Sequence, residues 1–406
     1  MLKKMTVRDL DDEQLGGKRA LVRVDYNVPL DDEGNVVDDA RIRATLPTLG
    51  YLRGRDARIV LLSHLGRPKG EVVPKFSLRP VADHLARLLG EPVRFLASTV
   101  SEEAMSASEE LGPGDILLLE NTRFDPRETK NDDAMAEALA ALGDVYVNDA
   151  FGSAHRAHSS TEGVAHYLQP AVAGLLLESE LEHLGGLLAD PRRPFVAILG
   201  GAKVSGKIDL IENLLGEVDH LCVGGAMACT FLRAMGLETG TSLVEEDLID
   251  LAGRLMERAT GTLLLPSDAV IAPTLEGGDE ARVVSVKAIP ADQMLLDIGP
   301  DSARAFADTV SSSQTILWNG PLGVFEEPAF AKGTEVVGQA IARATDAGAT
   351  SVVGGGDSAA AVAALGLVDR MKHVSTGGGA TLEFLAGKEL PGVAALTDTD
   401  MDKGAT

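Results

Sequence analysis

FVAILGGAKVSGKIDLIENLL, residues 195–215, joins a short apolar run to a glycine-rich turn and then to a helical pattern. A strand followed by a turn and a helix is typical of an α/β fold, and backbone N–H groups at such a turn bind phosphate. Residues 201–207 match the first seven positions of the P-loop pattern G-x-x-x-x-G-K-[ST]. The eighth is Ile208, which cannot supply the hydroxyl that holds Mg²⁺ in a P-loop. The stretch therefore predicts phosphoryl chemistry with the metal ligand elsewhere.

Similar apolar runs alternate with helical patterns along the whole chain. They lie at residues 19–24, 57–62, 93–96, 115–119 and 145–147 in the first half, and at 195–199, 220–223, 262–265, 282–284, 315–318, 351–353 and 372–374 in the second. Continuous apolar strands between helices indicate parallel sheets that are covered on both faces. Because 406 residues exceed one ordinary core, we expect an α/β chain with two Rossmann-like domains, each a parallel sheet covered by helices.

The boundary between the two domains is predicted near the middle of the chain. Residues 174–188 carry apolar side chains at helical spacing, and the sequence Asp190-Pro191-Arg192-Arg193-Pro194 then stops the helix. We expect a first domain over residues 1–172, an interdomain helix that acts as a hinge over 173–193, and a second domain over 194–387.

Composition excludes several classes of protein. No apolar run reaches the roughly 18 residues of a membrane span, and the N-terminal residues lack the apolar middle of a signal peptide. The two cysteines, Cys222 and Cys229, lie in an apolar segment, which fits a reducing compartment better than a disulfide framework. The net charge of −24 argues against nonspecific binding of nucleic acid. We expect a cytoplasmic protein.

Basic and polar residues follow the apolar runs of the first half, against the global charge. Asp25 and Asn27 follow the first run, with Arg41 a dozen residues on, and His64 and Arg67 follow the next. Two further segments contain Arg123, His155, Arg156 and His158. Ligands bind at the carboxyl ends of strands in open α/β sheets, and Arg suits phosphate and carboxylate, so these groups predict a socket for a small, multiply anionic substrate. The alternative is a set of unrelated surface ion pairs. A zinc site at His155 and His158 is improbable, because no third soft ligand lies nearby.

The second half carries further glycine-rich turns. Besides the turn at 200–207 they lie at residues 224–227, 318–326, 354–358 and 375–380. Two of them contain three consecutive glycines between a strand and a helix, an arrangement that presents backbone amides to phosphate. Asp357 is the candidate for the missing Mg²⁺ ligand, although Asp also favours a simple helix N-cap. Glu326 could accept hydrogen bonds from ribose hydroxyls or be a solvated loop charge.

Taken together these motifs resemble the phosphoglycerate kinase family. The resemblance rests on residues 22–29, 63–68, 148–160, 200–207, 318–326, 354–358 and 375–380, in the family's order over nearly the whole chain. It implies that the first domain binds 3-phosphoglycerate or 1,3-bisphosphoglycerate, that the second binds Mg·ATP or Mg·ADP, and that residues from about 388 to 406 pack back on the first domain. It implies a monomer in which the phosphoryl group is transferred directly, in line, on domain closure, with no nucleic acid or membrane as partner.

The resemblance also assigns individual residues. It implies triose binding by Asp25, Asn27, Arg41, His64, Arg67, Arg123 and Arg156. It implies nucleotide binding by Lys203, Lys207, Gly225, Asn319, Glu326, Gly354, Gly355, Gly356, Asp357 and Ser358, with Asp357 as the Mg²⁺ ligand. Catalytic roles fall to Arg41, Lys203, Gly378 and Gly379. Tyr26, Ala226 and Ser358 depart mildly from the family pattern, and the hydroxyl survives at Ser358.

Three other functions fit parts of the sequence. A P-loop NTPase or another sugar-acid kinase would use the turn at 200–207, but Ile208 speaks against the P-loop. A nicotinamide-dependent dehydrogenase would use a Rossmann turn, but the glycine spacing fits loosely and Lys203 and Lys207 would have no task. A noncatalytic nucleotide-binding scaffold would not need the arginines of the first half.

The acidic, lysine-poor composition predicts adaptation to high salt. Of 37 basic residues 24 are Arg, and the acidic residues are spread along the chain. The Debye length falls from about 10 Å at 0.1 M to about 3 Å at 1 M salt, which weakens repulsion between neighbouring carboxylates. We expect the midpoint of thermal unfolding to rise as KCl increases from 0.1 M to molar concentrations. A midpoint that stays constant or falls would contradict this prediction and leave the kinase assignment untouched.

Overall fold

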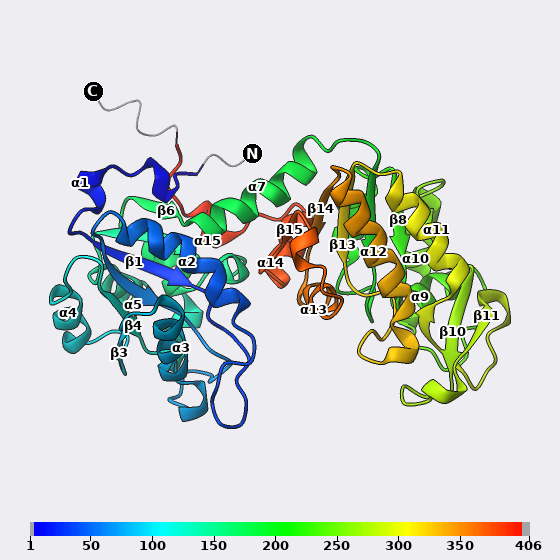
Figure 1. Ribbon diagram of the computed structural model, residues 1–406, viewed down its shortest axis with the longest axis horizontal. Helices are drawn as coiled ribbons and strands as arrows, with labels where there is room; N and C mark the ends of the chain where they lie inside the picture. Colours follow the sequence, from blue (N-terminus) through cyan, green and yellow to red (C-terminus); the bar gives the residue numbers. More distant parts are fainter. Residues whose placement is uncertain (1–3, 400–406) are drawn as a thin grey trace. The chain divides into compact units, whose positions relative to one another are not determined.

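The computed structural model describes residues 4–399 and divides the chain into two compact units. The first unit contains the residues up to Glu182 together with those from Glu389 onward, and the second contains His183–Lys388. Helix α7 (Leu175–Ala189) therefore includes the point at which the chain passes from one unit to the other. In Figure 1 the first unit is coloured from blue to green and includes the red segment with α15, and the second unit is coloured from green to orange.

The first unit is built on a six-stranded parallel sheet with the strand order β3-β4-β2-β1-β5-β6. The strands are β1 (Arg19–Val24), β2 (Arg58–Leu62), β3 (Arg94–Leu96), β4 (Ile116–Leu119), β5 (Val145–Asp149) and β6 (Ala171–Ala173). Consecutive residues of β4 and of β5 are buried, and successive side chains of a strand point to opposite faces, so both faces of the sheet are covered. The helices of this unit are α1 (Asp12–Leu15), α2 (Ala40–Arg53), α3 (Arg79–Leu89), α4 (Glu102–Glu109), α5 (Asp133–Ala140), α6 (Val164–Tyr167) and α15 (Pro391–Ala394).

The second unit contains a matching six-stranded parallel sheet with the order β15-β14-β13-β7-β8-β9. Its strands are β7 (Phe195–Leu199), β8 (His220–Val223), β9 (Leu263–Leu264), β13 (Thr315–Asn319), β14 (Thr350–Val353) and β15 (His373–Val374). Its helices are α8 (Ile208–Leu214), α9 (Met227–Ala234), α10 (Ile249–Arg258), α11 (Pro300–Ser311), α12 (Lys332–Asp346), α13 (Gly356–Ala364) and α14 (Gly379–Leu385). The core is mostly aliphatic and is built around the buried Trp318. The expectation of two parallel sheets covered by helices is confirmed.

A second, antiparallel sheet in this unit corrects one expectation. It has the order β11-β10-β12 and consists of β10 (Asp268–Ala272), β11 (Arg282–Ser285) and β12 (Met294–Ile298). Residues 282–284 were expected in a parallel sheet, but β11 pairs antiparallel with β10. The sequence did not distinguish the two cases, because a short apolar run reads the same in either sheet. This small sheet matters because β12 contributes to a cavity described below.

The C-terminal segment is fastened to the first unit by hydrogen bonds from β5 and from the N-terminal segment. The Nδ2 of Asn148, at the end of β5, donates to the Gly392 carbonyl at 2.9 Å. The Lys4 Nζ donates to the carbonyls of Ala394 and Leu396, each at 2.8 Å. Residues 400–406 of the segment that was expected to pack on the first domain lie outside the described residues.

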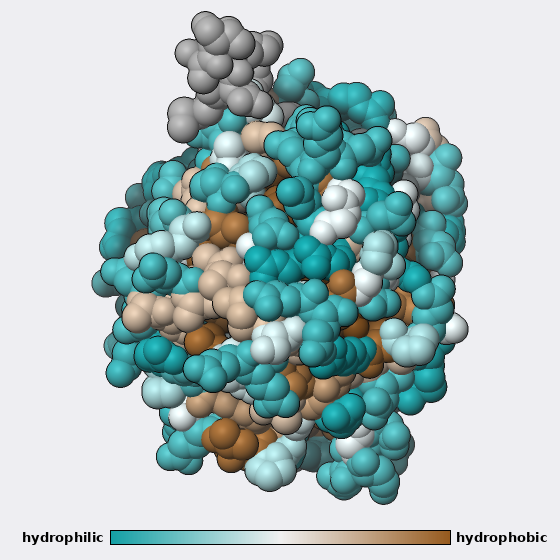
Figure 2. Space-filling view, turned by 90° about the vertical axis from the view of Figure 1, so that its left-hand side faces the viewer, coloured by the Kyte–Doolittle hydropathy of each residue, from teal (hydrophilic) through white to brown (hydrophobic). Residues whose placement is uncertain are grey.

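The surface is strongly polar, in keeping with the composition. The face shown in Figure 2 is mostly hydrophilic, with hydrophobic residues in small, separated groups. Within residues 4–399 we find no helix with both the length and the apolar character required to cross a membrane.

The bond from Asn148 to Gly392 should contribute measurably to the stability of the first unit. Asn148 is fully buried, and its Oδ1 also accepts from the Ala150 N–H at 3.1 Å. We expect Asn148→Ala to lower the free energy of unfolding by about 1–3 kcal/mol, because buried partners are left unsatisfied. Urea unfolding measures the change. Asn35→Ala, at an exposed position, should change it by no more than about 0.5 kcal/mol. Equal effects of the two substitutions would contradict the prediction.

Candidate functional site

In the first unit, the predicted triose-binding residues follow the carboxyl ends of four strands. Asp25 and Asn27 follow β1, His64 and Arg67 follow β2, Arg123 follows β4, and Arg156 follows β5, while Arg41 comes from the first turn of α2. Since β1, β2, β4 and β5 are parallel members of one sheet, these loops meet at the same edge.

Asp25 and Asn27 organise the loop after β1. The Arg41 Nη1 donates to the Asp25 Oδ1 at 3.3 Å and to the Asn27 carbonyl at 3.0 Å. The Asn27 Oδ1 accepts from the Gly66 N–H at 2.8 Å, which joins the loops after β1 and β2. Burial opposes ionisation of Asp25, but the positive groups around it outweigh burial and hold the pKa of this carboxyl below its usual range. Asp25 is therefore a charged anchor for Arg41.

His64, in the loop after β2, is held in its neutral form by its surroundings. Burial lowers the pKa of His64 well below its usual value, and the arginines around it act in the same direction. Its Nδ1 therefore accepts from the Arg23 Nη2, at 3.1 Å. Arg23 lies on β1 and is fully buried. His64, Arg41 and Arg23 together favour the ionised form of Asp25.

Arg123 is a partly desolvated cation beside other cations. Burial, Arg23 and Arg156 lower the pKa of its guanidinium to about 10. Its Nη1 donates to the Gly66 carbonyl at 2.9 Å, while its buried Nε has no hydrogen-bond partner. An anion bound at this edge would relieve the repulsion between these guanidinium groups and supply a partner for their remaining donors.

Arg67 and Arg156 are exposed, and each keeps free donors. Arg67 makes no hydrogen bond or ion pair with the residues that the structure describes. The Arg156 Nε donates to the His155 Nε2 at 3.0 Å, which leaves its terminal nitrogens available. The structure thus separates the predicted residues into a buried layer that holds the loops and an exposed layer with unused donors.

One buried acidic residue at this edge of the sheet was not identified from the sequence. Glu128 is fully buried and accepts from the Ser160 Oγ at 2.6 Å and from the Ser160 N–H at 3.0 Å. The Arg23 Nε donates in turn to the Ser160 Oγ at 2.8 Å. Ser160 lies in a single π-helical turn, Ser159–Gly163, a feature frequent at functional sites. No motif marks Glu128, because one of its partners, Ser160, is 32 residues away and the other, Thr122, belongs to no recognised pattern with it.

In the second unit, three glycine-rich turns pack backbone against backbone. The Gly200 N–H donates to the Asn319 carbonyl at 3.0 Å, the Gly201 N–H to the Pro321 carbonyl at 2.9 Å and the Gly225 N–H to the Leu322 carbonyl at 3.0 Å. Gly225 has a φ of +66°, and a Cβ there would lie 2.6 Å from the Gly201 nitrogen. Only glycine fits this approach, so the turns after β7, β8 and β13 form one continuous surface.

Lys207 stabilises the junction between the turns after β7 and β13. Its Nζ donates to the carbonyls of Gly200, at 2.7 Å, and Asn319, at 2.8 Å. Burial lowers the pKa of this ammonium to about 8, and Asp357 partly offsets the effect. Two of its three protons are therefore engaged with the backbone, and one remains for a ligand. Lys203, by contrast, is exposed and makes no hydrogen bond with the described residues.

The turn at 354–358 is held by its own polar side chains. The Ser358 Oγ donates to the Gly354 carbonyl at 2.8 Å and accepts from the Gly320 N–H at 2.5 Å. The Asn319 Nδ2 donates to the same Gly354 carbonyl at 2.7 Å. Gly355, with a φ of +94°, is the N-cap of α13, and Gly356 is its first residue. Ser358 and Asn319 thus shape the turn.

Asp357 lies in the first turn of α13 but does not cap it. The structure shows no side-chain hydrogen bond at the N-cap, and Asp357 is exposed with no partner among the described residues. Glu326 is likewise exposed and unpaired within that part of the chain. The interpretation of Asp357 as a simple cap is therefore wrong.

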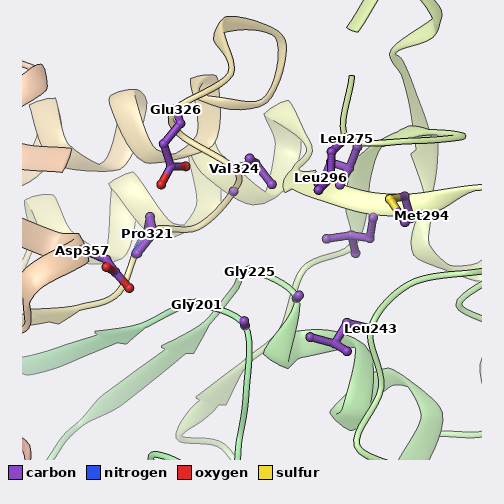
Figure 3. Close-up of a pocket in the computed structure, with 14 residues that line it drawn as sticks. Gly201, Gly225, Leu243, Leu275, Met294, Leu296, Pro321, Val324, Glu326 and Asp357 are labelled. Atoms are coloured by element: carbon purple, nitrogen blue, oxygen red, sulfur yellow. The ribbon is translucent and has the colours of Figure 1, made fainter. Parts of the chain in front are cut away.

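A cavity of about 400 Å³ lies beside these turns. Gly201, Gly225 and Pro321 line it, and Glu326 and Asp357 stand at one end (Figure 3). At the other end the wall is aliphatic, formed by Leu243, Leu275, Met294, Leu296 and Val324. A cavity with one apolar end and one polar end suits a ligand with a flat apolar ring and a charged tail. The aliphatic wall was not predicted, because its residues follow no motif.

Gly378 and Gly379 lie at the turn between β15 and α14, away from the lining of that cavity. Gly378 has a φ of +52° and precedes α14, which begins at Gly379. The Ser375 Oγ in the same turn is bonded to the Thr381 Oγ1 at 2.7 Å and accepts from the Gly377 N–H.

Asp357 fits a magnesium ligand that acts together with phosphates. Mg²⁺ is often held by one or two carboxylates and substrate phosphates rather than by a protein cage. Residues 4–399 contain no group of three His, Cys, Asp or Glu side chains arranged to hold a metal. A free, exposed carboxylate at the polar end of the cavity suits the first arrangement.

Comparison with known proteins agrees with this geometry. The model of the family described as Phosphoglycerate kinase matches residues 10–388. Phosphoglycerate kinase of Herpetosiphon aurantiacus is 55% identical over 400 residues, covering 98% of this chain and 100% of that protein. Phosphoglycerate kinase 3, cytosolic, of Arabidopsis thaliana is 53% identical over 401 residues, with 98% and 100% coverage.

Solved structures show the same fold. The structure of phosphoglycerate kinase from Coxiella burnetii matches with a TM-score of 0.86 and 42% identity, over 97% of this chain and 98% of that one. These matches give no support to adaptation to high salt, which stays a prediction.

Proposed function

The chain belongs to the phosphoglycerate kinase family, and we propose that its first unit binds the phosphorylated three-carbon acid and its second unit the magnesium nucleotide. Its activity is that of a phosphoglycerate kinase of glycolysis and gluconeogenesis, the reversible transfer of a phosphoryl group between 1,3-bisphosphoglycerate and ADP. The proposal for the two units rests on one observation above all. Cationic donors without protein partners gather at the carboxyl edge of the first sheet, in a chain whose net charge is −24.

We assign the exposed Arg67 and Arg156, together with the largely buried Arg123, to the substrate. Arg67, Arg123 and Arg156 would bind the phosphate and carboxylate oxygens, since guanidinium groups donate in a planar fork. Asp25, Asn27 and neutral His64 would orient the remaining polar groups and hold Arg41 in place. Arg41 reaches the same edge from α2 and would stabilise the charge of the phosphoryl group during transfer.

In the second unit the base and ribose would occupy the cavity, with Glu326 accepting from the ribose hydroxyls. The backbone N–H groups of Gly355 and Gly356 would face the phosphates together with Lys203 and the remaining proton of Lys207. Gly354, whose N–H donates to the Trp318 carbonyl at 2.9 Å, would shape the turn that presents them. We propose that the backbone N–H groups of Gly378 and Gly379 face the phosphoryl group during its transfer. Mg²⁺, held by Asp357 and the phosphates, would neutralise phosphate charge.

The reaction needs no protein nucleophile and no general base. The acceptor carboxylate is already ionised at neutral pH, so direct in-line transfer requires positioning and electrostatic stabilisation. We propose that residues 173–193 act as the hinge for the approach of the two substrates. Monomeric action in the cytoplasm is part of the same proposal, supported for the compartment by the name of the Arabidopsis relative.

The two layers of arginines predict different kinetic effects. Arg41→Ala should lower kcat about 100-fold or more with a smaller effect on the KM for nucleotide, because its charge is proposed to act on the transferring group. Arg67→Ala should instead raise mainly the KM for 3-phosphoglycerate, about tenfold. Both constants come from a coupled assay of ATP-dependent turnover.

Arg43→Ala is the matched control for Arg41. Arg43 lies on the same helix, is mostly exposed and pairs with Asp39 at 2.8 Å. Its removal should leave both constants within about twofold of the parent protein. A change in triose affinity alone for Arg41→Ala would show that Arg41 binds substrate and does not act on the transferring group.

Asp357 should determine the dependence on magnesium. Asp357→Ala should lower turnover about 100-fold or more and raise the Mg²⁺ concentration that gives half of the remaining rate, while the unfolding midpoint changes little. Asp369→Ala, at another exposed position of the same unit, should behave like the parent protein. Unchanged turnover and magnesium dependence in Asp357→Ala would remove Asp357 from the site.

A further inference from the structure

Asp297 is a buried carboxylate outside the residues assigned so far. It lies on β12, the strand whose Met294 and Leu296 line the nucleotide cavity, and it is fully buried. Its Oδ1 accepts from the Ile298 N–H at 2.9 Å and its Oδ2 from the Gly333 N–H at 2.6 Å. No cation among the described residues forms an ion pair with it. Burying a carboxylate without a cation costs free energy of folding, and the two hydrogen bonds from backbone amides offset part of that cost.

These bonds connect β12 to the far end of a loop that forms part of the same cavity. The loop begins after β13, contributes Pro321, Gly323, Val324 and Glu326 to the lining, and ends at α12, where Gly333 is the second residue. The Val324 N–H also donates to the Leu296 carbonyl of β12 at 2.9 Å. The loop is thus fastened to the strand at its middle and at its end.

Contact between the loop and the carboxylate is direct. A Cβ at Gly323 would lie 2.3 Å from the Asp297 Oδ1, so glycine is required for the loop to close over this group. Any change in the position or hydrogen bonding of the carboxylate is therefore passed to a residue that lines the cavity.

We infer that Asp297 is a positioning residue for the nucleotide, which holds the loop of residues 320–333 against β12 and so keeps the apolar end of the cavity in shape. The inference rests on the proposed assignment of this cavity to the nucleotide. Figure 3 shows the two walls that Asp297 connects, with Leu296 and Met294 on the strand and Val324 and Glu326 on the loop.

The carboxylate also gives this arrangement a dependence on pH. Burial raises the pKa of Asp297 to about 7, against the opposing effect of the two amide donors. Above pH 7 the group is ionised and both oxygens accept; below pH 7 it gains a proton, which weakens one of the two bonds. The apolar end of the cavity should therefore bind its ligand more tightly at pH 8 than at pH 6.

The charged groups on the surrounding elements do not replace Asp297 in this role, because they are engaged with one another or exposed to solvent. They are Lys332 with Glu335 on α12, Arg304 with Asp301 on α11, Asp268 with Ser302 on β10 and α11, and the exposed Arg282, Glu326 and Glu327.

Binding of adenosine, measured by calorimetry from pH 6 to pH 8.5, tests the inference without the titration of nucleotide phosphates. Parent protein should lose about fivefold in affinity as the pH falls from 8 to 6, the effect expected of one weakened hydrogen bond. Asp297→Asn keeps the shape but replaces one acceptor by a donor. It should bind about fivefold more weakly at pH 8 and show no change with pH, while the KM for 3-phosphoglycerate stays the same.

Asp268→Asn is the matched control. Asp268 is a buried carboxylate on the neighbouring strand β10 and accepts from the N–H groups of Asp301 and Ser302 at the start of α11, which contributes nothing to the cavity lining. This variant should bind adenosine like the parent protein and keep its pH dependence.

Three results would overturn the inference. They are equal weakening by Asp297→Asn and Asp268→Asn, parent-like binding by Asp297→Asn, and a parent affinity that is constant with pH. The last needs no variant, so it applies even if Asp297→Asn fails to fold. Failure of the proposed function is distinguishable, because parent protein would then bind no adenosine at all.

Discussion

Parallel strand pairing is the constraint on which both halves of this chain depend. When all six strands of a sheet run in the same direction, every loop that follows a strand emerges at one edge. Residues as far apart in sequence as Asp25 and Arg156 therefore follow strands that end at the same edge. The second sheet uses the same geometry for its glycine-rich turns, and there the backbone itself, joined by the bonds of Gly200, Gly201 and Gly225, becomes the surface.

Charge within the first unit is arranged against the composition of the whole chain. Arg23 is fully buried and Arg123 nearly so, and each is held by neutral or carbonyl acceptors. Asp25 and Glu128 are two of the buried acidic side chains at this edge, whereas Arg67 and Arg156 are exposed. The chain as a whole thus carries a large negative charge, while the carboxyl edge of the first sheet presents cationic donors without protein partners. This arrangement favours binding of a small anion over binding of an extended one.

Much of the fold could be predicted from sequence, and the exceptions have physical reasons. Strands β1, β7 and β8 begin and end where the predicted runs do, because buried parallel strands are mostly apolar along their whole length. β6, β10 and β12 were missed. β6 is only three residues long. In β12 the acidic Asp297 interrupts the apolar pattern, and the sequence does not show that the amides of Ile298 and Gly333 allow this residue to be buried. Glu128 and the aliphatic wall of the cavity escaped prediction for the same reason: their roles come from tertiary contacts.

Residues that belong to the same motif differ in their hydrogen bonds. Lys203 and Lys207 share one glycine-rich turn, and Asp357 and Ser358 share another. The structure separates them, because Lys207 is half-buried, Ser358 is buried and both are bonded to backbone, whereas Lys203 and Asp357 are exposed and make no hydrogen bond with the described residues. A buried donor whose bonds are already made shapes the site, and an exposed group with none is available to a ligand. The same reasoning leads to Asp297, which no motif contains. Its two bonds join a strand and a loop that both line the cavity, so its effect reaches the ligand through the backbone rather than by contact.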